Sequence, residues 1–98
     1  MTVLQIYLSC LDGKKAELEA RFRDTFLPAI SVQEGFLHAS MLRSVDAPLS
    51  YQIEFAFESE ELRQGWVHSE EHQRALPIIK SLCEETSFAR FDVVDKTD

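Results

Sequence analysis

Apolar residues alternate with other residues along four short stretches of the chain, a period typical of β-strands. These stretches cover residues 3–10, 36–43, 51–57 and 88–94. The first has the clearest pattern, because its leucines, its isoleucine and Cys10 all fall on one side, whereas the second carries apolar residues on both sides and is amphipathic on neither. A polar loop containing Pro48 separates the second stretch from the third, which predicts a β-hairpin.

A helical period separates the first two predicted strands. Leu18, Phe22 and Phe26 recur every four residues, with charged residues on the other sides. This pattern predicts an amphipathic helix over residues 14–27, which Pro28 ends or kinks.

Two serines predict the starts of further helices. Ser59 and Ser69 are each followed by two glutamates, and negative charge is favoured at the N-terminal end of a helix. Trp66, the only tryptophan, lies on the first of these helices. Pro77 suits the first turn of a further short helix.

The order of these elements predicts the fold class. One strand, a helix, two strands, a helix and a last strand form the ferredoxin-like βαββαβ arrangement, an α+β fold with a four-stranded antiparallel sheet and helices on one face. We expect a single domain over residues 1–98. Ile53, Phe55 and Phe57 share one side of their strand, while alternation assigns several other apolar residues to the opposite face. These are Leu37, Ala39, Met41, Phe91 and Val93. An uncovered apolar face is uncommon on a monomer, so we expect two copies to pair through their sheets as a homodimer.

Charge and composition narrow the range of partners. The 98 residues carry a formal net charge of −7, with 17 acidic and 10 basic residues. This balance would repel a phosphate backbone, so we expect no nucleic-acid partner. No apolar run approaches the roughly 20 residues needed to span a membrane, and the N-terminus lacks the order of a signal peptide. We therefore expect a cytoplasmic protein with no membrane partner, in which Cys10 and Cys83 are reduced thiols.

One short motif resembles a metal site. Residues 68–72 read His-Ser-Glu-Glu-His, a pattern in which two histidines on one helix can share a zinc ion. If Ser69 caps a helix, however, His68 precedes that helix and cannot share a face with His72. We therefore expect no metal, and no effect of chelation on stability or activity. The chain also lacks a glycine-rich phosphate loop and a dinucleotide fingerprint, so we expect no cofactor.

Several short motifs together resemble the antibiotic biosynthesis monooxygenase family. They are Gly35-Phe36-Leu37-His38-Ala39, Leu42-Arg43-Ser44-Val45-Asp46, Phe57-Glu58 and Trp66-x-x-Ser69-x-x-His72. The resemblance covers nearly the whole chain and implies a dimeric α/β barrel. The family that the chain resembles includes cofactor-independent oxygenases of phenolic or quinol substrates and haem-degrading enzymes. The haem-degrading pattern is not matched, because the first strand lacks its asparagine and Leu76 stands where its histidine would lie.

The resemblance also implies candidate pocket residues. Trp66 and His72 match family positions that line the pocket, and His38 could face the same space. Phe55 and Phe57 stand where the family often has Glu and Trp, which would make the pocket more apolar.

On residue type alone, each candidate also has a structural explanation. Trp66 fits a core aromatic, and His72 fits either a surface residue or a partly buried base. His38 fits a core or interface histidine. Tyr7 could point to the dimer face or donate a hydrogen bond in the pocket.

Two functions follow from these observations. The first is a cofactor-independent monooxygenase of a small electron-rich aromatic or quinol, with His72 or His38 as the base. Trp66, Phe55, Phe57 and Tyr7 would then contact the substrate. The alternative is a non-catalytic dimeric α/β-barrel protein that binds a small apolar ligand.

Overall fold

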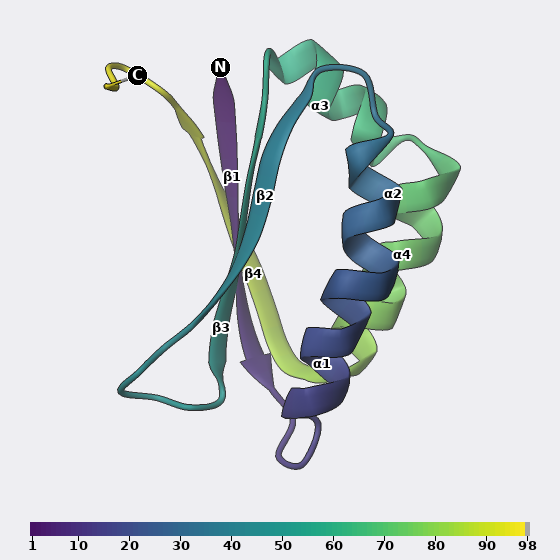
Figure 1. Cartoon of the computed structure of the whole chain (residues 1–98), viewed down its shortest axis with the longest axis vertical. Helices are drawn as coiled ribbons and strands as arrows, with labels where there is room; N and C mark the ends of the chain where they lie inside the picture. The colour runs from purple at the N-terminus through teal and green to yellow at the C-terminus, as the bar shows by residue number, and fades with distance from the viewer. Residues whose placement is uncertain (98) are drawn as a thin grey trace.

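A computed structural model gives the fold of residues 1–97, with four strands and a layer of helices (Figure 1). In chain order the elements are β1 (Thr2–Cys10), α1 (Lys15–Arg21), the π-helical segment η1 (Phe22–Phe26), α2 (Leu27–Ser31), β2 (Phe36–Arg43), β3 (Ser50–Phe57), α3 (Glu60–Val67), α4 (Glu70–Ser81) and β4 (Cys83–Asp92).

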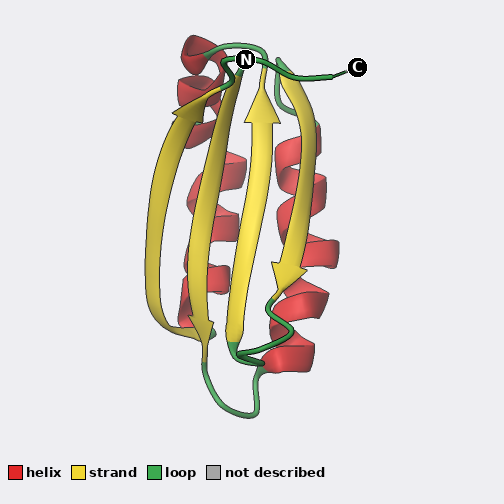
Figure 2. Cartoon of the chain, turned by 90° about the vertical axis from the view of Figure 1, so that its left-hand side faces the viewer, coloured by secondary structure: helices red, strands yellow, loops and turns green. Residues whose placement is uncertain are grey.

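The four strands form one antiparallel sheet in the order β2-β3-β1-β4. All the helices lie on one side of this sheet, and its other face is uncovered (Figure 2). The order and the topology confirm the predicted ferredoxin-like α+β fold. No helix within residues 1–97 is long and apolar enough to cross a membrane.

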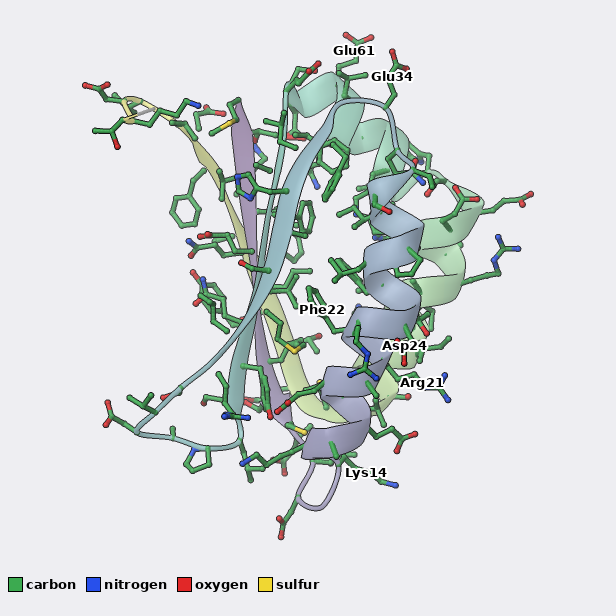
Figure 3. All side chains as sticks on the ribbon, viewed as in Figure 1. Lys14, Arg21, Phe22, Asp24, Glu34 and Glu61 are labelled. Carbon is green, nitrogen blue, oxygen red and sulfur yellow. The ribbon has the colours of Figure 1, made fainter. Side chains whose placement is uncertain are left out.

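The first helix continues past its predicted end, through Pro28 to Ser31. Its buried face carries Leu18, Phe22, Phe26 and Ile30, four residues apart. In a regular helix each four-residue step overshoots one turn by about 40°, so such a series would drift off the sheet. The wider π-helical turn, in which the Leu27 amide donates to the Phe22 carbonyl, takes up part of this overshoot. Phe22 accordingly points toward the sheet while Arg21 and Asp24 point away (Figure 3).

Two other boundaries differ from the prediction. Pro77 lies inside α4 rather than at the start of a new helix. Pro77 and Gln73 are both exposed, so water can solvate the carbonyl that loses its partner. Strand β4 begins at Cys83, earlier than the predicted residue 88, because its polar first half pairs with the end of β1. Alternation of apolar residues could not find a strand half that lies at an exposed edge.

A bulge in β2 changes which residues face the helices. The register shifts between Phe36 and His38, so Phe36 lies opposite Phe57 on the helix side, while His38 lies opposite Ala56 on the open side. Strict alternation along residues 36–43 predicts that Phe36 and His38 share one side of the strand, and the bulge shows that prediction to be wrong.

The same register corrects the predicted composition of the open face. Ala39 and Met41 pair with Phe55 and Ile53 and pack against the core. The open face is consequently more polar than the sequence pattern indicated.

Candidate active site

A cavity of about 620 Å³ lies between the helix side of the sheet and helices α3 and α4. Its sheet wall consists mainly of Leu4, Ile6, Leu8 and Phe55. Its helix wall includes apolar side chains from η1, α3 and α4. These are Phe26, Trp66, Val67 and Leu76. The cavity is thus mostly apolar and large enough for a small aromatic molecule.

The mouth of the cavity lies between α4 and the edge strand β4. Phe88 of β4 lines the cavity and is 71% exposed, because β4 has no further strand beside it. Lys80, also exposed, lines the cavity from α4. An aromatic ring and an ammonium group therefore border the entrance.

Trp66 and His72 form the most specific contact in the wall. Their ring centroids lie 4.8 Å apart and the rings are nearly perpendicular. Trp66 is 2% exposed and also makes an edge contact with Phe26, at 5.7 Å between centroids. The tryptophan is thus both a core residue and a cavity residue, so the two roles weighed from the sequence coincide.

Ser69 fixes the chain between these two rings. As the N-cap of α4 it accepts a hydrogen bond from the His72 amide at 3.1 Å, and its hydroxyl donates to the Trp66 carbonyl at 2.7 Å. Ser59 caps α3 in the same way through the Leu62 amide. Both predicted caps are confirmed.

The position of Ser69 also separates the two histidines of the zinc-like motif. His68 lies at the C-terminal cap of α3 and His72 lies inside α4, so the two do not share a helix face. Within residues 1–97 no three potential ligands cluster as a metal site would require.

The surroundings of His72 favour the neutral form of its imidazole. Its Nδ1 is buried, and no group among residues 1–97 hydrogen-bonds to it. Protonation would place a charged N–H there without an acceptor. Burial is the main cause that lowers the pKa of His72, and the positive charges of Lys80, Arg63 and His68 lower it further. A neutral imidazole can accept a proton from a ligand in the cavity.

The structure brings together three of the six residues that the sequence suggested for the site. Trp66, His72 and Phe55 line the cavity. Phe57 is fully buried beside Phe55 and does not reach the cavity lining.

The two remaining candidates lie on the opposite face of the sheet. Tyr7 pairs with Gln52 and Ser87, and His38 pairs with Ala56, all on the open side. Neither side chain shares the space that Trp66 and His72 border.

Sequence reasoning did not find Arg63, Lys80 or Phe88 as cavity residues. Phe88 could have been found from the phase of the last strand, since it lies opposite Ile6 on the helix side. The two cations carry no local signal, because both belong to helices with many charged residues.

Comparison with known proteins bears on this site. The model of the antibiotic biosynthesis monooxygenase family matches residues 1–77, which contain Trp66, His72 and most of the cavity wall. The chain belongs to the antibiotic biosynthesis monooxygenase family. No curated protein sequence matches it significantly.

Solved structures share the fold of this family member at low sequence identity. SnoaB from Streptomyces nogalater, a cofactor-independent oxygenase, is 18% identical and superimposes with a TM-score of 0.82, covering 97% of this chain and 95% of SnoaB. Rv0793 from Mycobacterium tuberculosis is 10% identical, with a TM-score of 0.83 and coverage of 99% and 98%. At these identities the likeness establishes the fold and leaves the reaction to be argued from the site.

Proposed function

We propose that this chain is a cofactor-independent monooxygenase of a small electron-rich aromatic or quinol substrate, with His72 as its general base. The observation that supports it most strongly is the position of His72, whose imidazole borders an apolar cavity together with Trp66 and whose pKa is lowered mainly by burial. The family model and the fold shared with SnoaB, itself a cofactor-independent oxygenase, agree with this assignment.

The proposed reaction asks little of the protein beyond this arrangement. His72 takes the proton of a phenolic hydroxyl, and the resulting phenolate gives one electron to O₂. The two radicals combine at the ring carbon opposite the hydroxyl, and the proton that His72 removed returns to the resulting peroxide anion to form a hydroperoxide. Loss of water from it leaves a carbonyl, so one oxygen atom enters the quinone product and the other leaves as water. All the electrons that reduce O₂ come from the substrate.

The apolar walls would serve two steps of this sequence. Phe55 and Trp66 would stack on or border the aromatic ring, and the exclusion of water would protect the reactive intermediates.

Oxygen uptake with 1-naphthol or a dihydroxynaphthalene tests the proposal. A general base commonly contributes about 10²–10⁴-fold to a rate, so His72→Gln should slow uptake by roughly a hundredfold or more. His38→Gln is the matched control, since His38 lies on the other face of the sheet, and it should retain the wild-type rate. The proposal would be overturned if oxygen uptake were no faster than without protein, or if wild type and His72→Gln consumed oxygen at equal rates.

One observation favours a second function, a non-catalytic protein that binds a small apolar ligand. A catalytic histidine is usually oriented by a hydrogen bond to its second ring nitrogen, and Nδ1 of His72 has no such partner within residues 1–97. Saturable binding of naphthols without oxygen uptake would support this alternative.

We also propose that two copies pair through their open sheet faces. Tyr7 and Phe91 are 40% and 46% exposed on this face. The polar residues between them satisfy one another, because the Tyr7 hydroxyl donates to Gln5 and the Gln5 amide donates to Glu54. Such paired groups cost less to bury than unpaired ones. Sedimentation should give twice the chain mass, and Phe91→Asp should shift it toward the monomer; a monomeric wild type at micromolar concentration would contradict the pairing.

A further inference from the structure

The cavity contrasts in charge with the rest of the molecule. The chain as a whole carries a net charge of −7. The lining of the cavity nevertheless includes two cationic side chains, Arg63 and Lys80, and no aspartate or glutamate. An acidic protein that keeps its carboxylates out of one cavity and places cations there is suited to a negatively charged ligand.

Arg63 lies deep in the wall rather than on the surface. Its side chain is only 11% exposed, and its Nε donates to a carboxylate oxygen of Glu60. Its two terminal nitrogens make no hydrogen bond within residues 1–97. Neither is a fully buried unpaired atom, so both remain accessible to solvent or a ligand. The Glu60 contact therefore holds the guanidinium in place through one nitrogen and leaves the two that could bind a carboxylate side by side.

Glu60 contacts a second arginine as well as Arg63. The other carboxylate oxygen of Glu60 lies 2.7 Å from Nε of Arg90, whose Nη1 in turn contacts Asp92. Two carboxylates, those of Glu60 and Asp92, thus balance the two guanidinium groups of Arg63 and Arg90. An anion in the cavity would therefore bind Arg63 through its two terminal nitrogens, whose donors no carboxylate within residues 1–97 occupies.

Both cations act on the same part of the cavity. Arg63 of α3 and Lys80 of α4 line the same cavity as His72, and both lower the pKa of His72. A ligand whose ring lies beside Trp66 and His72 would therefore have a positive group at the mouth and a second in the wall.

We propose that the substrate of this cavity is an aromatic hydroxy acid, whose carboxylate binds the terminal nitrogens of Arg63. Lys80 at the mouth attracts the anion and contributes less to the bound state, because exposed ion pairs are weak. This inference rests on the proposed function and names the substrate class for that site. It concerns binding alone, so it can be tested where no oxygen is consumed.

Isothermal titration calorimetry with two ligands that differ only in a carboxylate provides the test. The wild-type protein should bind 3-hydroxy-2-naphthoate at least tenfold more tightly than 2-naphthol. Arg63→Gln should reduce this preference to about twofold or less while the affinity for 2-naphthol stays within about twofold. Arg74→Gln is the control, because Arg74 is an exposed arginine that is absent from the cavity lining.

Further variants and outcomes decide the proposal. Arg63→Lys should restore part of the preference, since it keeps the charge and loses the paired donors. If Arg63→Gln does not fold, Lys80→Gln should still reduce the preference, by a smaller factor that vanishes at high salt. Equal affinity of the wild type for the two ligands, or an equal loss of both in Arg63→Gln, would overturn the proposal. A strong preference without oxygen uptake in the naphthol assay would support the ligand class and refute only the monooxygenase reaction.

Discussion

Ser59 and Ser69 offer a matched pair of substitutions that separates helix stability from site geometry. Both are N-caps followed by two glutamates, and each accepts a hydrogen bond from the amide three residues later, at 3.2 Å and 3.1 Å. Replacing such a cap by alanine typically costs about 1 kcal/mol of stability. Ser69 also donates to the Trp66 carbonyl at 2.7 Å, a hydrogen bond worth roughly a further 1 kcal/mol.

Thermal unfolding and naphthol binding should therefore respond differently to the two variants. Ser59→Ala should lower Tm by about 4–8 °C, and Ser69→Ala by up to about twice as much. Ser69→Ala should in addition weaken naphthol binding several-fold, measured well below Tm, because Ser69 links the chain of Trp66 to that of His72. Ser59→Ala should leave binding unchanged. Equal effects on binding by the two variants, or no effect of Ser69→Ala, would refute the positioning role of Ser69.

Three other predictions concern stability and reactivity. Gly35→Ala should destabilise the fold by roughly 1–3 kcal/mol more than Gly13→Ala. Both glycines have φ near +81°, but only at Gly35 would a Cβ meet another side chain, that of Leu62 in α3. Equal Tm losses in thermal unfolding would contradict this prediction. Burial raises the pKa of Cys83 to about 11. Iodoacetamide at pH 8 should therefore modify this thiol on the order of a hundredfold more slowly in the native protein than in the unfolded chain. Similar rates in the two states, measured by mass spectrometry, would argue against a buried thiol. Because the pKa of His72 is lowered by folding, the unfolded chain binds more protons just below pH ~6.5; stability in urea should fall as the pH drops below that value, and His72→Gln should flatten this part of the profile. An unchanged slope in His72→Gln would count against a buried neutral imidazole.

The parts of the fold that could be predicted from the sequence rest on local signals. Ser59 and Ser69 accept hydrogen bonds from amides three residues later, so their capping role can be recognised in a short stretch of sequence. The strand pattern of β1 was equally clear, because its alternate residues face a buried helix layer throughout. The order of the helices and strands then left only a few possible topologies.

The parts that could not be predicted depend on contacts between distant segments. Pro28 was expected to end or kink its helix, but packing of the aromatic face against the sheet favours a continuous helix with one wider turn. The bulge at the start of β2 places Phe36 on the helix side, which the alternation of residues along a regular strand cannot predict. Arg63 and Lys80 meet at one cavity only because α3 and α4 cover the same sheet.

Saturable quenching of Trp66 fluorescence by naphthols tests most directly whether the cavity between the sheet and helices α3 and α4 is the ligand site. Trp66 is the only tryptophan, so its emission reports this wall of the cavity alone. We predict saturable quenching by 1-naphthol, after correction for absorption against a free tryptophan derivative. The same ligand should bind more weakly to Leu76→Phe, whose larger side chain narrows the cavity and which keeps Trp66 as the only tryptophan. Emission that changes no more than that of the free derivative, across a broad set of naphthols and hydroquinones, would contradict the account.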